Sequence, residues 1–94
     1  MNPATICFRD AAHFQVQNPS WTLVHGVATD PVGGKRAYAW LERNGMCFDA
    51  QYSVLLVAHE FYKVYKIQPG AGVRYSADAA KENMKKYQRY SRWA

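Results

Sequence analysis

The sequence has no apolar run approaching the roughly 20 residues that cross a bilayer. Its start also has no basic segment followed by an apolar one, which is how an export signal begins. These absences predict a cytoplasmic protein with no membrane partner. Cysteine is scarce as well: Cys7 and Cys47 are the only two and lie far apart in the chain, which excludes a disulfide scaffold.

Motifs that bind metals or phosphates are missing too. The histidines and cysteines show neither Cys-x-x-Cys nor His-x-x-x-His spacing, so we expect no metal site. Gly33-Gly34-Lys35 lacks the glycine spacing of a phosphate-binding loop, and a hairpin loop explains it. We therefore expect no cofactor.

Apolar residues, in contrast, are plentiful enough for a packed interior. Of the 94 residues, 49% are hydrophobic, 15% aromatic and 20% charged, which is typical of a folded globular chain. A chain this short builds a single core. We expect one domain over residues 1–94.

Positive charge gathers at the C-terminal end of the chain. The net charge is +5, and residues 81–94 hold one acid, Glu82, against five cations: Lys81, Lys85, Lys86, Arg89 and Arg92. Tyr90 and Trp93 are interleaved with them. Aromatic residues beside arginine and lysine are typical of protein interfaces and also of single-stranded nucleic-acid binding. A solvated helix face and core-closing rings are the alternatives, and among partners we favour a protein.

Turn-forming residues divide the chain into short elements. We expect a helix from the first residues to about Gln17, and strands over residues 20–28, 35–43 and 46–51. A strand over 53–57 leads into a helix over 58–66, and a brief edge strand over 73–75 precedes a final helix capped by Ser76. Asn44-Gly45 predicts a two-residue hairpin. This order predicts an α+β fold, in which an N-terminal helix packs on a small antiparallel sheet that is followed by a C-terminal helix.

Counting outward from the Asn44-Gly45 turn assigns each hairpin residue to a face. One face is expected to be core and holds Ala37, Ala39, Leu41, Met46, Phe48 and Ala50. The other holds Tyr38, Trp40, Glu42, Cys47, Asp49 and Gln51. On this second face Tyr38 is diagonal to Asp49, about 7–8 Å away by backbone and within reach of a long side chain. We expect that face to present a Tyr and an Asp beside a Trp.

The order of these residues resembles the transglutaminase-like branch of the papain-type cysteine-protease fold. That branch has a Cys at the start of a helix, a strand that often ends in Gly, a strand reading His-Ala-Trp-(Val/Leu)-Glu, and an Asp on the next strand. The corresponding segments here are Cys7-Phe8, Leu23–Gly26, Ala37–Glu42 and Phe48-Asp49. The chain is also similar to small uncharacterised bacterial and phage proteins that join a Leu-Val-His-Gly strand to a His-Ala-Trp-Leu-Glu strand. The resemblance covers about residues 5–51.

The departure from this pattern lies at Tyr38, where the resemblance implies the catalytic His. An imidazolium and a helix N-terminus can lower the pKa of a Cys well below its usual value of about 8.5. A phenol with a pKa near 10 is neutral at pH 7, so Tyr38 is a poor base. Asp49 would have no imidazole to orient, and could instead accept a hydrogen bond from the Tyr38 hydroxyl.

Another histidine could supply the missing base, and His25 on the neighbouring strand is the best candidate. A structural role is the more common one for a lone strand His beside Gly. Cys7 is equally well explained as a small apolar core residue. Cys47 faces the Asp49 side and is expected to be structural.

Three functions follow from these patterns. The first is a transglutaminase-like domain that has lost its base and acts by binding a partner protein, for example as an inhibitor or a phage-encoded modulator of a host system. The second is an active thiol hydrolase or acyl transferase that uses Cys7 as nucleophile, Asp49 as orienting residue and His25 or a repositioned group as base. The third is a basic nucleic-acid-binding module that uses the C-terminal helix.

Overall fold

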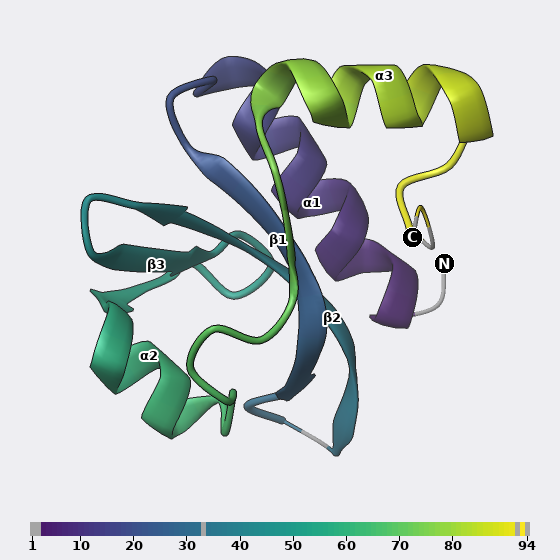
Figure 1. Cartoon of the computed structure of the whole chain (residues 1–94). Helices are drawn as coiled ribbons and strands as arrows, with labels where there is room; N and C mark the ends of the chain where they lie inside the picture. The colour runs from purple at the N-terminus through teal and green to yellow at the C-terminus, as the bar shows by residue number, and fades with distance from the viewer. Residues whose placement is uncertain (1–2, 33, 92, 94) are drawn as a thin grey trace.

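The computed structural model describes residues 3–32, 34–91 and 93, and over these residues three helices pack on a five-stranded sheet (Figure 1). The α+β class predicted from the sequence is confirmed. The helices are α1 (Pro3–Gln17), α2 (Ala58–Val64) and α3 (Ala77–Tyr87). The strands are β1 (Thr22–Thr29), β2 (Lys35–Arg43), β3 (Met46–Asp49), β4 (Val54–Val57) and β5 (Val73–Tyr75).

The sheet is antiparallel and its strands lie in the order β4-β3-β2-β1-β5. Strands β1 to β4 follow one another as a meander, and β5 joins last, beside β1. The predicted hairpin is confirmed, because Glu42 pairs with Cys47 across the turn. Asn44 (φ 50°) and Gly45 (φ 77°) both have the left-handed backbone that a tight two-residue turn requires.

Two elements end earlier than the sequence predicts, and each end has a local cause. Strand β3 ends at Asp49 because its carboxylate Oδ1 accepts the backbone N–H groups of Gln51 (2.9 Å) and Tyr52 (3.3 Å), which turns the chain. Helix α2 ends at Val64, and Lys66 then takes a left-handed backbone (φ 53°) that cannot continue the helix. Side-chain capping and backbone reversal, rather than hydrophobic spacing, set both boundaries.

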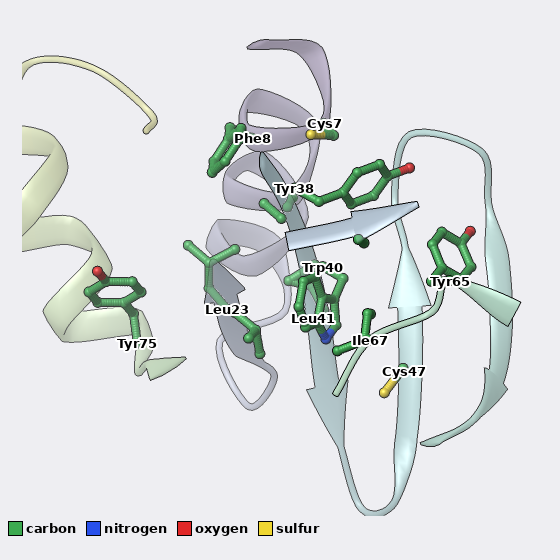
Figure 2. Packing of buried hydrophobic residues seen from close by; sticks show 14 of the residues in the cluster. Cys7, Phe8, Leu23, Tyr38, Trp40, Leu41, Cys47, Tyr65, Ile67 and Tyr75 are labelled. Carbon is green, nitrogen blue, oxygen red and sulfur yellow. The ribbon is translucent and has the colours of Figure 1, made fainter. Parts of the chain in front are cut away.

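Helix α1 covers one face of the sheet. Leu23 pairs with Leu41 and His25 with Ala39, so these side chains share the face toward α1. Ala11 of α1, Leu23 and Leu41 are completely buried, and Figure 2 shows the Leu23 and Leu41 side chains beside the helix. Burial of these apolar side chains is the main force that holds α1 to the sheet.

The opposite face of the sheet is also core, so the expectation that only one face is buried is wrong. Tyr38, Trp40, Cys47 and Asp49 are all completely buried on it. Helix α2 and the residue that follows it supply the cover: Phe61 lies 6.2 Å from Trp40 between ring centroids and stacks on Tyr65 at 4.1 Å. The apolar residues of α2 therefore help to form a second core layer on this face of the sheet.

One residue assigned to the core face, Ala37, is exposed. The pairing explains why. Strand β3 pairs only with Leu41–Arg43 of β2, and β5 pairs only with Leu23–His25 of β1. The remaining halves of β1 and β2 therefore extend past their neighbours as a two-stranded ribbon, in which fewer elements can cover a small side chain.

Helix α3 begins as predicted, because the Ser76 hydroxyl accepts the backbone N–H of Ala79 (3.2 Å). Its inner face carries Ala80, Met84 and Tyr87, which pack against the core. Helix α3 contacts α1, β1 and β5. The two terminal helices therefore share one side of the sheet (Figure 1).

Candidate functional site

Asp49 is the centre of the predicted site and is fully buried. Its Oδ2 accepts hydrogen bonds from the hydroxyls of Tyr38 (2.7 Å) and Tyr65 (2.6 Å), while Oδ1 accepts the two backbone N–H groups that end β3. The Tyr38–Asp49 bond is the one expected if Tyr38 replaces a histidine. The Tyr38 and Tyr65 rings, both labelled in Figure 2, lie 5.8 Å apart between centroids in a T-shaped contact. Four donors leave this carboxylate satisfied within the core.

Both phenols bound to Asp49 are protonated at neutral pH. Burial raises the pKa of Tyr38 and of Tyr65, and the hydrogen bond to the Asp49 carboxylate raises each pKa further. A phenol that donates its proton to a buried carboxylate cannot also accept one from a thiol. Tyr38 therefore does not act as a base in this arrangement.

Cys7 lies in α1, is 1% exposed and reaches the site through Arg36 of β2. The Arg36 guanidinium donates from Nη1 to the Cys7 sulfur (3.3 Å) and lies over the Tyr38 ring at 4.5 Å from its centroid. Burial raises the pKa of the Cys7 thiol, and this outweighs the Arg36 hydrogen bond and charge, which lower it. The thiol is therefore neutral at pH 7 and a weak nucleophile.

Arg36 also fixes two segments beside the site. Its Nε donates to Asp30 Oδ2 (3.0 Å) and its Nη2 to Gln51 Oε1 (3.3 Å). Burial of Asp30 raises its pKa, but the Val32 N–H and the Arg36 guanidinium together lower it by more. The guanidinium is thus held between a carboxylate, a thiol, an amide and a ring.

His25 lies elsewhere. Its pairing with Ala39 directs it to the α1 face, opposite Tyr38. There its ring contacts those of Phe8 (4.8 Å), Tyr75 (5.0 Å) and Trp93 (4.6 Å). Burial lowers the pKa of His25 to about 4, so the imidazole is neutral at pH 7. Tyr38 bonds directly to Asp49, Arg36 links Cys7 to Tyr38, and His25 lies on the other face of the sheet from Tyr38 and Asp49.

A second polar cluster lies on the same face, around Glu42. Its Oε2 accepts hydrogen bonds from the Tyr62 hydroxyl (2.5 Å), the Trp40 indole (2.9 Å) and the Cys47 thiol (3.7 Å), and Oε1 pairs with Arg74 (3.1 Å). Burial and the nearby Glu42 charge raise the pKa of Cys47 to about 12. Cys47 is therefore unreactive, which agrees with a structural role.

The cationic and aromatic residues predicted to bind a partner divide into two groups. Lys85 and Lys86 are exposed on α3. Tyr90 and Trp93 instead contact the body of the protein: the Tyr90 hydroxyl lies 3.1 Å from His13 Nε2, and Trp93 is 6% exposed. Arg89 is exposed beside the Tyr87 ring, and Arg92 lies outside the described residues.

Sequence reasoning missed Arg36 and Tyr65. Arg36 could have been found, because alternation puts it on the same face as Tyr38 and Trp40. Tyr65 carried no such signal, since its contact with Asp49 depends on where the chain runs after α2. Within the described ranges, no group of three His, Cys, Asp or Glu residues is arranged to hold a metal ion.

Comparisons with protein-family models, with curated proteins and with solved structures find no match for this chain. The resemblance to the transglutaminase-like branch therefore depends on the order of Cys7, Tyr38 and Asp49 and on the motif around Trp40. No helix in the described part of the chain is long and apolar enough to span a membrane.

Proposed function

We propose that this protein is a transglutaminase-like domain without a catalytic base that acts by binding an acidic partner protein. The observation that carries the first half of the proposal is the Asp49 carboxylate, whose Oδ2 is occupied by two phenol protons. An orienting carboxylate in a thiol enzyme needs an imidazole partner. Here the corresponding partner is Tyr38, and the thiol has a raised pKa.

The second half of the proposal is supported by charge. Lys81 and Lys85 are four residues apart, which puts them on one side of α3, with Lys86 adjacent, and Arg89 is exposed just after the helix ends. Few acids lie among them. A cationic surface of this kind attracts a complementary acidic one and raises the rate of association.

Thiol labelling tests the loss of catalysis. We expect iodoacetamide to label Cys7 and Cys47 slowly at pH 7.5 in the folded protein and quickly in urea, because both thiols are buried with raised pKa values. Tyr38→His should lower the pKa of Cys7 and speed its labelling. Fast labelling of wild-type Cys7 would support the thiol-enzyme alternative, and an unchanged Cys7 in Tyr38→His would contradict the assignment of the three positions.

Affinity capture from the native host tests the binding surface. Lys85→Glu/Lys86→Glu should lose a partner that wild type captures, whereas Lys35→Glu/Lys63→Glu, which changes the charge equally at two other exposed lysines, should keep it. Equal capture by both variants would overturn the proposal. If the captured material is nucleic acid, with affinity that falls steeply between about 50 and 200 mM salt, the nucleic-acid alternative replaces it.

A further inference from the structure

The chain reverses direction after α3. Gln88 takes a left-handed backbone (φ 52°, ψ 38°) and its N–H bonds to Met84 O (2.8 Å), which ends the helix. The residues that follow turn back toward the start of α1 (Figure 1). We call residues 88–91 and 93 the tail.

The tail contacts the body of the protein through two histidines. Near its start, the Tyr90 hydroxyl meets His13 Nε2 at 3.1 Å, with the rings in a T-shaped contact. Near its end, the Trp93 ring lies on His25 (4.6 Å between centroids) and on Tyr75 (5.0 Å), and the Trp93 indole donates to Arg89 O (2.8 Å). Trp93 is thereby buried within a cluster of rings.

This ring cluster leaves a polar atom without a partner. His25 Nε2 is buried and makes no hydrogen bond among the described residues. A buried polar atom that lacks a partner is less stable than the same atom in water. The packing of Trp93 against His25 therefore carries an unfavourable free-energy contribution. This contribution disappears when the His25 ring is exposed to solvent.

We propose that the tail is a proton-operated latch: protonation of the His25 imidazole releases Trp93 from the ring cluster and frees the segment that carries Arg89 and Tyr90. The proposal concerns regulation of the surface described under the proposed function, but its test uses no partner. Its failure would leave that function untouched, and the loss of that function would leave the latch intact.

Among the residues that the structure describes, none of the rings that contact His25 carries a negative charge. Tyr75 is the titratable residue that faces it from β5, and burial raises the pKa of Tyr75, so this phenol is neutral. From α1 it meets Phe8, while the neighbouring Arg9 and Asp10 pair with each other at 3.2 Å. Burial is the cause of the lowered His25 pKa.

The size of the pH response follows from the difference in the His25 pKa between the latched and the released state. In the latched state the pKa of His25 is about 4, and a solvent-exposed imidazole has a pKa of about 6.5. The latched state therefore loses stability as the pH falls through 6.5 toward 4. The equilibrium constant for release should rise about 30-fold between pH 8 and pH 5.

Indole N–H spectra of ¹⁵N-labelled protein test the latch, with the Trp93 signal assigned from Trp93→Phe. Between pH 8 and pH 5 we expect the Trp93 signal to move toward the position of a free indole and to exchange faster with water. Trp40, which is buried and bonded to Glu42, should not change and so reports an intact fold.

Two variants provide the controls. His25→Phe keeps a ring in the cluster and removes the titration, so Trp93 should stay in place at pH 5. His13→Gln should leave the response of Trp93 unchanged. A wild-type Trp93 signal that is the same at pH 8 and pH 5 would overturn the proposal without any variant, and so would an equal pH response in a folded His25→Phe protein.

Discussion

The two carboxylates on the α2 face, Asp49 and Glu42, are both hydrogen-bonded to phenols, yet they are held in different ways. Asp49 is completely buried and is bound by two phenols and two backbone N–H groups. Glu42 lies nearer the rim and pairs with the partly exposed Arg74. The comparison shows that a core carboxylate can be satisfied by neutral donors, whereas one at the rim combines a cation with neutral donors.

The largest difference between the two should appear when each carboxylate is removed. Asp49→Ala leaves two buried phenols and two backbone N–H groups without an acceptor, so we expect it to cost about 3–5 kcal/mol of unfolding free energy. Glu42→Ala should cost less, about 1–2 kcal/mol, because two of its partners, Tyr62 and Arg74, are partly exposed and can bond to water instead. Urea unfolding measures both costs. Equal costs would mean that the rim and the core do not differ in this respect.

Removing a single phenol hydroxyl should lower the free energy of unfolding by less, and the loss should again be larger around Asp49 than around Glu42. Tyr38→Phe and Tyr65→Phe should each cost about 1–2 kcal/mol, and Tyr62→Phe, at the rim, about 1 kcal/mol or less. Because Tyr38 and Tyr65 share one oxygen of Asp49, their double variant should deviate from additivity. Tyr38→Phe combined with Tyr62→Phe is the additive control. The double-mutant cycles are read from urea midpoints.

The smallest effect concerns pH. Burial raises the pKa of Glu42, but the Tyr62 and Trp40 hydrogen bonds and the Arg74 charge lower it by more, so its folded pKa lies below the unfolded value. Glu42 therefore adds stability above pH 4.5, and this stability is lost as the pH falls through the folded pKa. The difference between wild type and Glu42→Gln should shrink in acid.

Local signals in the sequence were enough to predict the hairpin and its register. The Asn44-Gly45 turn fixes which residues face each other, and alternation then puts Tyr38 near Asp49. The bond between them was predictable because both residues lie on adjacent strands of one meander. The final helix was predictable as well, since the Ser76 cap acts within a single turn.

The burial of the sheet face that holds Tyr38 and Asp49 could not be predicted from such local signals. Its cover comes from Phe61 and Tyr65, whose contacts depend on the path of the chain after β4. Tyr90 and Trp93 illustrate the same difficulty. Their sequence neighbours suggested an exposed surface, but a reversal at Gln88 returns both rings to the body of the protein.

Arg36 connects parts of the protein that are far apart in the sequence. Its guanidinium touches Asp30, which begins the turn after β1, and also the sulfur of Cys7 in the first helix. A change confined to that turn, such as Asp30→Asn, would free the guanidinium to move and so alter the surroundings of the sulfur. A spectroscopic probe at Cys7 would therefore sense the conformation of the turn that follows β1.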